Sequence, residues 1–411
     1  MSFMRRSAGG AAAAALAAAA IAGCGGSDSS SSTAAAGAKS ASGAAAPKVS
    51  DAQLQATVDA ALRSHDIKAS SLPPLMRDAL ARAAQTLTPA QLDKAFECWK
   101  ATSCTIGDGP VTLGHADPFG GNTWRQFTKM NVILQALTHR EVGKYIYTDA
   151  NYDLATYQAN LRTMIAKGAK AIVTINEFGQ AANAAYAAAQ RQGVKISTYV
   201  GAMEDAPANS YTTRVQYDLC ESGTAMAETV KKVTSSNGPV AFLGGLPAFP
   251  SDIKMKGCID KAGVSVAFSS ATNYTAAGTQ KAASALIASG KPVKAILYTY
   301  ANTVPSIVNA YRKAGKDVPP IITSTQSNAT ACQREEHPYP LYFSNSANWA
   351  ARVSVDAAVQ ALDGQTVPKA VIFPLPFSAA TSADCDTAKP AEYPGQTLVP
   401  DALADKMLAG K

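Results

Sequence analysis

The sequence predicts an α/β protein in which two lobes, each built around a parallel sheet, are joined by a hinge and preceded by a helical appendage. Three observations lead to this fold class. Short apolar runs alternate with helical segments of about 10–15 residues, which is the pattern of βαβ units. The alternation occurs twice, over residues 111–199 and again over 225–323. Residues 50–100, in contrast, carry only a helical spacing of apolar residues.

The first series of elements starts after Pro110. We expect strands at 111–114, 144–147, 171–175 and 194–199, and helices over 127–137, 156–167 and 181–192. These strands are nearly continuous apolar runs, which is typical of parallel strands buried on both faces.

The second series repeats this plan. Helices are expected over 225–233, 253–262, 278–288 and 304–314, and strands over 239–243, 264–268, 294–298 and 320–323. In open parallel sheets, ligands bind beyond the carboxyl ends of the strands. Two such lobes that face each other predict a ligand-binding cleft between them.

The helical appendage is expected over 47–105. Leu54, Val58 and Leu62 recur at helical spacing, Pro73-Pro74 interrupt the pattern, and Thr88-Pro89 start a further helix as N-cap and first residue.

The N-terminus has the pattern of an export signal. Arg5 and Arg6 precede an apolar stretch over 8–22, which is short for a membrane span of ~20 residues and ends at small residues before Cys24. This arrangement resembles the lipobox of bacterial lipoproteins, which implies cleavage after residue 23 and a lipid on Cys24. An ordinary signal peptide with a chance cysteine is the alternative. Residues 24–46, almost all Ser, Ala and Gly, are expected to form a flexible linker. We therefore expect an extracytoplasmic protein, anchored by lipid to the outer face of the cell membrane.

Composition limits the function further. Hydrophobic residues make up 47% and charged residues 16% of the chain, as in globular proteins. The net charge of +7 is spread thinly, with no basic run longer than a pair such as Lys231-Lys232, so we expect no nucleic-acid partner.

Six cysteines remain once Cys24 is set aside. An even number in an exported chain favours disulfides, although spacing alone leaves the connectivity open. We favour pairing neighbours along the chain: Cys98 with Cys104, Cys220 with Cys258, and Cys332 with Cys385. A zinc site is the rival interpretation, but the metal-binding spacings Cys-x-x-Cys and His-x-x-x-His are missing from the sequence, so we expect no metal.

Several segments, in their order and spacing, resemble the type I periplasmic binding proteins of the ribose and galactose group. They are Gly114-His115-Ala116-Asp117-Pro118-Phe119 with Trp124, the runs 147–153, 158–165, 168–173 and 191–196, Tyr217-Asp218 with Gly223, and the run 311–315. The resemblance covers roughly residues 110–370. It implies two Rossmann-like lobes, the first formed by 106–216 and 346–366 and the second by 217–345 and 367–411.

Other positions depart from that family. Where its sugar binders often carry Asp-Arg after the fourth strand, this chain has Tyr199-Val200. Their Asn-Asp after a late strand is replaced by Tyr300-Ala301-Asn302, and their Gly-Phe-Asp by residues 323–326. The fold survives these changes, whereas the assignment to a sugar is weakened.

A cleft that binds a small polar molecule needs flat apolar faces and a few oriented polar groups. The candidates are Phe119, Asn122, Trp124, Arg125, Asn176, Tyr199, Asp218, Asp252, Tyr300, Asn302, Gln326 and Trp349. For several of them a structural role is the alternative: lobe packing for both tryptophans, and a helix cap for Asp218 and Asp252.

The sequence carries no nucleophile elbow, P-loop or dinucleotide fingerprint, so we expect neither an enzyme nor a cofactor. The resemblance implies a monomeric lipoprotein that binds a small polar ligand, with a sugar as the leading ligand class, and delivers it to an ABC permease. Two alternatives stay open: a receptor that presents its ligand to a membrane sensor, and a binder of an amino-acid derivative, a nucleoside or an aromatic compound.

Overall fold

The computed structural model of the protein describes residues 49–409, apart from 202 and 204, and all of these belong to one unit that runs from Ala41 to Lys411. The expected signal peptide over 1–23, Cys24 and the linker over 24–46 lie outside the described residues.

The first sheet has seven strands. Their order is β1 (Ser103–Thr105), β3 (Val142–Asp149), β2 (Val111–Asp117), β4 (Ala169–Asn176), β5 (Lys195–Gly201), β6 (Thr213–Gln216) and β12 (Ala370–Ile372). All neighbours are parallel except β1 and β3. Leu113 of the interior strand β2 is paired with Tyr145 on one side and Ala171 on the other. The carboxyl ends of the parallel strands therefore share one edge of the sheet.

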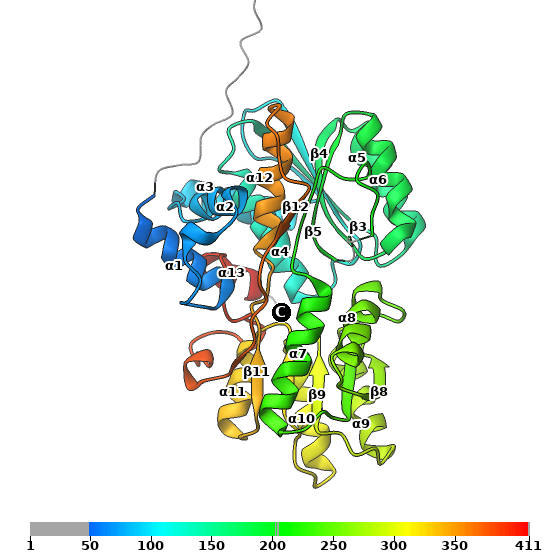
Figure 1. Ribbon diagram of the computed structural model, residues 1–411. Coiled ribbons are helices and arrows are strands. Elements are labelled where there is room, and N and C mark those ends of the chain that lie inside the picture. Colours follow the sequence, from blue (N-terminus) through cyan, green and yellow to red (C-terminus); the bar gives the residue numbers. More distant parts are fainter. Residues whose placement is uncertain (1–48, 202, 204, 410–411) are drawn as a thin grey trace, which may run out of the picture. The chain divides into compact units, whose positions relative to one another are not determined.

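Helices cover both faces of this sheet (Figure 1), as α/β layers require. The helices α4 (Thr123–Ala136) and α12 (Ala350–Leu362) contribute to one hydrophobic core, and α5 (Leu154–Ala166) and α6 (Asn183–Arg191) to another. Asn122 starts α4, because its side chain accepts a hydrogen bond from the Arg125 amide at 3.0 Å. The stripe of Phe127, Met130 and Ile133 is completely buried, as its helical spacing predicts.

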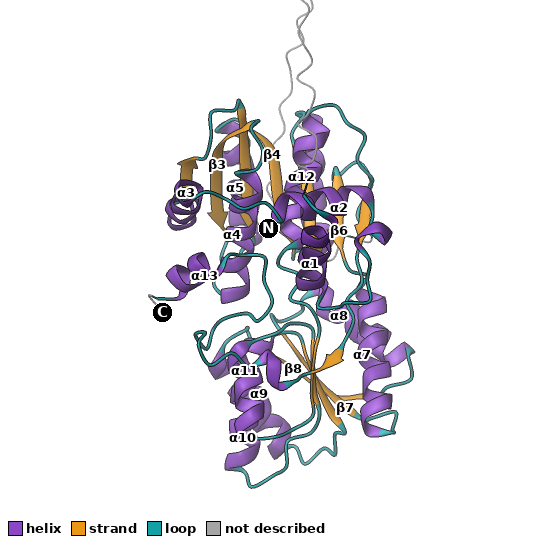
Figure 2. Cartoon of the chain, turned by 90° about the vertical axis from the view of Figure 1, so that its left-hand side faces the viewer, coloured by secondary structure: helices purple, strands orange, loops and turns teal. Residues whose placement is uncertain are grey.

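The second sheet has six strands in the order β13 (Ser378–Ala379), β11 (Leu341–Phe343), β10 (Ile321–Thr323), β9 (Ala295–Tyr298), β7 (Val240–Gly244) and β8 (Val266–Ala271). Only β13 runs antiparallel to its neighbour. One face packs on α7 (Leu219–Thr234) and α8 (Pro250–Lys261), and the other on α9 (Ala276–Ala288), α10 (Val304–Lys313) and α11 (Asn328–Glu336). Figure 2 shows these two groups of helices on opposite sides of the strands. The expected α/β class with two parallel-sheet lobes is confirmed.

The appendage contains α1 (Asp51–Leu62), α2 (Pro74–Ala83) and α3 (Pro89–Lys100), which share a hydrophobic core with α4 and α12 of the first lobe. A polar network strengthens this junction. Asp356 of α12 accepts a hydrogen bond from Gln135 at 2.6 Å and is paired with His139 at 2.8 Å and with Arg82 of α2 at 3.3 Å. The short 3-10 helices are η1 (Ala69–Ser71), η2 (Gly179–Ala182), η3 (Ala301–Thr303) and η4 (Ser382–Asp384).

The C-terminal segment differs from the expected domain boundaries. We expected all of 367–411 in the second lobe, but β12 pairs with β6 in the first sheet, and α13 (Asp401–Leu408) packs against α3. The edge of β6 offers unpaired backbone groups, which β12 satisfies. Likewise β1, which we placed in the appendage, is hydrogen-bonded to β3 of the first sheet. Helix α7 also begins six residues earlier than the expected start at 225, because Asp218 caps it.

Three disulfides form in the pairing that we favoured: Cys98 with Cys104, Cys220 with Cys258, and Cys332 with Cys385. The first joins α3 to β1, the second joins α7 to α8, and the third joins α11 to the residue after η4. Among the described residues, no group of three or more His, Cys, Asp or Glu side chains is arranged to hold a metal ion.

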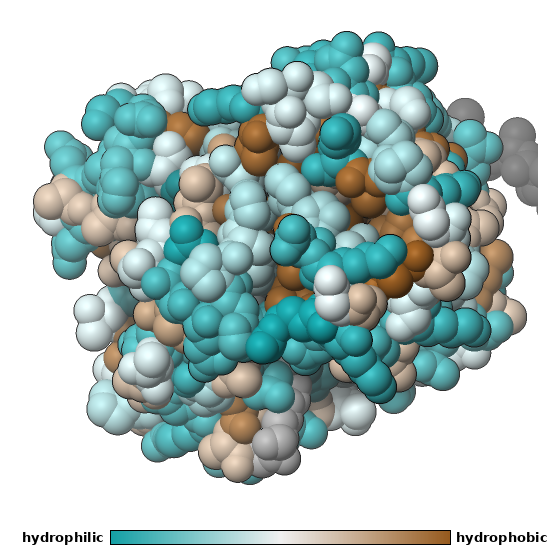
Figure 3. All heavy atoms as spheres, turned by 90° about the horizontal axis from the view of Figure 1, so that it is seen from below, coloured by the Kyte–Doolittle hydropathy of each residue, from teal (hydrophilic) through white to brown (hydrophobic). Residues whose placement is uncertain are grey.

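The face of the described part that is seen from below is mostly polar. Figure 3, which views the molecule from below Figure 1, shows mostly hydrophilic residues with smaller groups of hydrophobic ones. The large hydrophobic side chains that are exposed are Ile253, at 56%, and Ile372, at 41%. Within residues 49–409 no helix has the length and apolar character needed to cross a membrane.

Candidate binding pocket between the lobes

A pocket lies where the carboxyl ends of strands from both sheets meet. It encloses about 660 Å³ of space free of atoms, part of it open to solvent. The first lobe lines it with Asn122, Trp124, Arg125, Ile175, Glu177, Val200 and Gly201, and the second with Phe249, Ser251, Asp252, Met255, Tyr274, Thr299, Tyr300, Ser324 and Thr325. The remaining lining residues, Tyr217, Ser346 and Ala347, belong to segments that connect the lobes.

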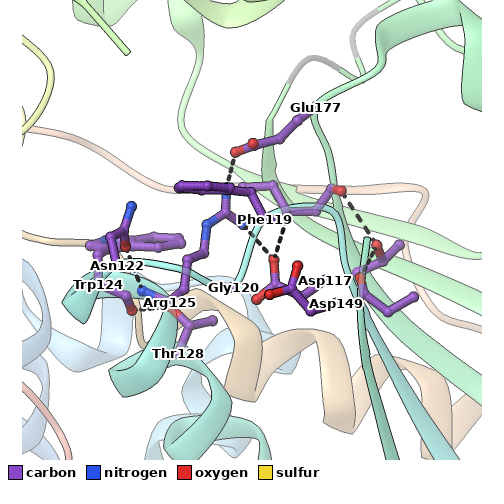
Figure 4. Close-up of polar contacts among 12 residues, drawn as sticks. Asp117, Phe119, Gly120, Asn122, Trp124, Arg125, Thr128, Asp149 and Glu177 are labelled. Atoms are coloured by element: carbon purple, nitrogen blue, oxygen red, sulfur yellow. Dashed lines mark hydrogen bonds and ion pairs between the residues drawn. The ribbon is translucent and has the colours of Figure 1, made fainter. Parts of the chain in front are cut away.

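Arg125 is the central charge of the first-lobe wall. It stands in the first turn of α4, is only 3% exposed, and lies between two carboxylates, as Figure 4 shows. One guanidinium nitrogen donates to Glu177 Oε1, and the other is paired with Asp117 Oδ1 at 3.4 Å. Burial lowers the pKa of a guanidinium, but these two carboxylates outweigh it and raise the pKa of Arg125, so the side chain stays charged.

Glu177 follows β4 and is 3% exposed. Burial raises its pKa, and Arg125 opposes that rise. Its Oε2 atom is buried without a hydrogen-bond partner, although Oε1 accepts from Arg125. A buried carboxylate oxygen without a donor is costly, so Glu177 presents an acceptor to whatever occupies the pocket.

Asp252 provides the carboxyl group of the opposite wall. It lies in the first turn of α8, is 8% exposed, and accepts a hydrogen bond from the Gly245 amide at 2.7 Å. Burial and, to a smaller extent, the charge of Glu177 raise its pKa to about 7, against the lowering effect of that hydrogen bond. Gly245 has to be a glycine, because a Cβ there would overlap the Tyr274 ring.

Aromatic rings form much of the second-lobe wall. Tyr274 lies edge-on to Tyr300, with ring centroids 5.4 Å apart, and to Phe249 at 6.4 Å. Phe249 in turn meets Tyr152 of the first lobe at 6.4 Å. The rings therefore make a continuous contact from one lobe to the other. Lys254 and Asp205, 3.9 Å apart, add an ion pair between the lobes.

Trp124 forms the aromatic face of the first lobe. Its ring lines the pocket beneath the Arg125 guanidinium, which lies 5.0 Å from the ring centroid, and its Nε1 atom donates to the Ser346 carbonyl. Because Ser346 lies in a segment that connects the lobes, Trp124 touches both the pocket and the hinge.

The pocket contains five of the twelve residues that the sequence analysis proposed. They are Asn122, Trp124, Arg125, Asp252 and Tyr300. In each case the residue lies in the first turn of a helix, at its N-cap or just after a strand.

The other seven do not line the pocket. Phe119, Asn176, Tyr199, Asp218, Asn302, Gln326 and Trp349 hold neighbouring structure instead. Trp349 packs on Phe373 with ring centroids 4.7 Å apart, and Asp218 caps α7 by accepting from the Cys220 and Glu221 amides.

The remaining five also have partners within the protein. The Tyr199 hydroxyl lies 2.8 Å from Nε2 of His115, whose pKa burial lowers to about 3, so that imidazole is neutral. Asn176 donates to the Gly179 carbonyl at 3.0 Å, Asn302 to the Glu392 carbonyl at 3.5 Å, and Gln326 to Asp384 at 2.7 Å. The Phe119 amide donates to Asp117 at 3.1 Å.

Sequence reasoning missed several lining residues. Glu177 directly follows the proposed Asn176, but Glu177 lines the pocket whereas the Asn176 side chain donates to the Gly179 carbonyl. Phe249 and Tyr274 lie in loops after β7 and β8, at the strand ends where ligands are expected. A search of both loops for aromatic residues would have found them.

The two lobes, the pocket between their strand ends and its mixed aromatic and charged lining define a two-lobed solute-binding protein. Residues 116–366 match the model of the periplasmic binding protein domain family, so the chain belongs to this family. Membership places the protein outside the cytoplasm.

Solved structures agree with this fold. An ABC transporter solute-binding protein from Bacillus halodurans with bound myo-inositol is 17% identical, covers 67% of this chain and 96% of its own, and gives a TM-score of 0.59. The arabinose-binding component of a Shewanella transporter is also 17% identical, with a TM-score of 0.58 and 66% and 92% coverage. A 5-methylthioribose-binding protein from Thermotoga lettingae is 16% identical, with a TM-score of 0.57 and 72% and 97% coverage. A comparison with curated protein sequences finds no significant match.

Proposed function

We propose that this protein is the solute-binding component of an ABC importer and captures a sugar or polyol in the pocket between its lobes. The observation that carries the proposal is the pocket itself. Flat rings from both lobes, Trp124 and Tyr300, stand beside buried polar groups with bonding capacity to spare, Glu177 Oε2 and Ser251 Oγ. Aromatic faces cover the C–H surfaces of a sugar, and buried polar atoms bond its hydroxyls.

The hinge between the lobes explains how the solute is held and then released to a permease. A ligand that touches both walls stabilises the closed arrangement, and only its differential affinity for the closed form shifts the equilibrium. Contacts between the lobes, such as Phe249 with Tyr152, already favour this arrangement. A membrane permease that opens the lobes would break the contacts of one wall and release the solute.

The proposed ligand class also draws support from the similar structures, whose names describe arabinofuranose, myo-inositol and 5-methylthioribose as their ligands. We further propose that lipid on Cys24 anchors the protein, which acts as a monomer. Mass spectrometry of the exported protein tests the lipid, and a Cys24→Ala variant should be released from the membrane fraction. Light scattering tests the monomer.

Thermal-shift screening of the purified protein against sugars, polyols, nucleosides, amino acids and aromatic acids tests the function. Binding to the folded state alone raises the melting temperature by mass action, and the stabilisation is about 2.7 kcal/mol at a hundredfold excess over Kd. A hit among sugars or polyols, with a smaller shift in a Trp124→Ala variant, supports the proposal. Stabilisation by another class alone would contradict the sugar assignment.

A further inference from the structure

We propose that the solute carries a positive charge, as an ammonium group on a molecule of sugar or polyol size. This inference rests on the proposed function and narrows its ligand class. It comes from the charge balance of the pocket, from one buried acceptor atom and from the aromatic wall.

The lining of the pocket has more carboxylates than cations. Glu177 and Asp252 line it from opposite lobes, and Asp117 is paired with the same guanidinium as Glu177, on its other side. Arg125 is the cationic side chain of the lining. One guanidinium therefore faces three carboxyl groups, two of them at the pocket surface.

Nearby lysines do not restore the balance. Lys129 donates to the backbone carbonyls of Trp99 and Ala101 at 2.6 and 3.1 Å and lies over the Tyr147 ring. Lys254 is paired with Asp205 between the lobes, and Lys256 lines an adjoining cavity and is not part of the lining of this pocket.

A buried acceptor points to the same ligand. Glu177 is 3% exposed and its Oε2 atom has no hydrogen-bond partner, while Arg125 already occupies Oε1. An ammonium group offers three donors and no acceptor, so it can bond Glu177 and supply the missing charge at once. A neutral hydroxyl would supply the bond but leave the excess negative charge in a poorly solvated site.

The rings provide a surface suited to a cation. Tyr274, Tyr300 and Phe249 line the pocket together with Asp252, and Trp124 already receives the Arg125 guanidinium over its face. Aromatic faces attract cations more strongly where water is excluded. Burial also raises the pKa of Asp117, Glu177 and Asp252, because the charged form of each carboxyl is poorly solvated there.

Calorimetry with pairs of probes, each an amine and its neutral counterpart, tests the inference. The probes are D-glucosamine with D-glucose, D-galactosamine with D-galactose, and glucamine with glucitol, at about pH 7, where an amine with an ordinary pKa is largely charged. N-acetylglucosamine serves as a neutral probe with the nitrogen retained. We expect at least one amine to bind with a Kd about ten times lower than that of its neutral partner, or lower still. The N-acetyl compound should bind no more tightly than the neutral sugar.

Variants of the two carboxyl groups in the lining test whether they cause the preference for the amine. Asp252→Asn and Glu177→Gln, each checked for folding by its melting curve, should shrink the preference for the amine several-fold. Glu228→Gln should leave it unchanged, because this control removes a carboxylate of α7 that is 59% exposed and is paired with Lys231, away from the pocket lining. A neutral member that binds as tightly as its amine overturns the inference and leaves the proposed function standing. If neither member of any pair binds, the proposed function fails and the inference falls with it.

Discussion

Arg63 and Asp384 join the appendage to the second lobe. The guanidinium donates two hydrogen bonds to the carboxylate, at 2.8 and 2.9 Å, and both side chains are 10% exposed. Arg63 caps the C-terminus of α1, whereas Asp384 lies in η4, next to the cysteine that the third disulfide ties to α11. Because the appendage is fixed to the first lobe through Arg82 and Asp356, this pair links the two lobes outside the hinge.

Replacing Arg63 with Ala should therefore loosen the lobes. Removing one partner leaves a mostly buried carboxylate with fewer donors, which we expect to cost about 1–3 kcal/mol of unfolding free energy. The more open ensemble should show a larger radius of gyration in X-ray scattering and a higher Kd for the ligand. Lys94→Ala is the control, because Lys94 and Glu97 form an exposed pair, with side chains 45% and 64% accessible, and such pairs contribute ~0–1 kcal/mol. Equal behaviour of the two variants would show that the link has no effect on lobe closure.

Trp124 should act through its ring in the pocket. Trp124→Ala should weaken ligand binding by about 1–3 kcal/mol, the scale of burying a large apolar side chain. The buried stripe of α4 is untouched, so the fold should persist. Trp124→Phe keeps a ring but loses the hydrogen bond to Ser346, and we expect an intermediate affinity by calorimetry. Unchanged affinity in the alanine variant, with a lowered melting temperature, would make Trp124 a packing residue only.

Asp252 should make stability depend on pH in the absence of ligand. Its pKa is about 7 in the folded protein and near the ordinary 3.8 when unfolded. Between these values the folded state holds a proton that the unfolded state lacks. Stability is therefore highest below the unfolded pKa and falls as pH rises, by up to about 1.4 kcal/mol per pH unit, until the folded pKa is passed.

Asp252→Asn removes this dependence and keeps an acceptor for the Gly245 amide. The difference in unfolding free energy between the variant and the native protein should grow in favour of the variant by about 1–3 kcal/mol as pH rises from about 5 to about 8. Urea unfolding measures it. Other groups that face Asp252, namely Glu177, Arg125, Tyr152, Tyr274 and Lys256, are present in both proteins and cancel in the comparison. If the difference in unfolding free energy between the two proteins does not change with pH, the pKa of Asp252 has the ordinary carboxyl value.

The contact between α7 and α8 depends on Gly223. A Cβ there would lie 2.5 Å from the Met255 carbonyl oxygen and 3.3 Å from the Cys258 Cβ, and the disulfide between Cys220 and Cys258 limits how far the helices can separate. Gly223→Ala should therefore cost about 1–3 kcal/mol. Gly257, within α8, has no atom within 4 Å of the position that a Cβ would take, and Gly257→Ala should stabilise by about 0.5–1 kcal/mol. If chemical denaturation gave equal changes in unfolding free energy for Gly223→Ala and Gly257→Ala, the close packing at Gly223 would be contradicted.

The periodic elements could be predicted because their signals are local. The apolar runs of β2 to β5 and the stripe of α4 require burial wherever they pack, and Asn122 caps its own helix through a residue three positions away. The disulfides followed from cysteines close in the chain, such as Cys98 and Cys104. Strand ends also indicated Trp124, Arg125 and Asp252, because the carboxyl edge of a parallel sheet is set by topology.

Tertiary structure decided what distant segments share. Tyr199 and Trp349 were expected in the pocket from their position, yet His115 and Phe373 engage them inside the first lobe. The return of β12 to the first sheet and the pairing of Arg63 with Asp384 depend on residues more than 150 positions apart. Local pattern establishes that a segment is a strand or that a carboxylate is available. Which edge the strand completes, and which charge the carboxylate meets, is settled only when the whole chain has packed, because those energies exist only between surfaces brought together by folding.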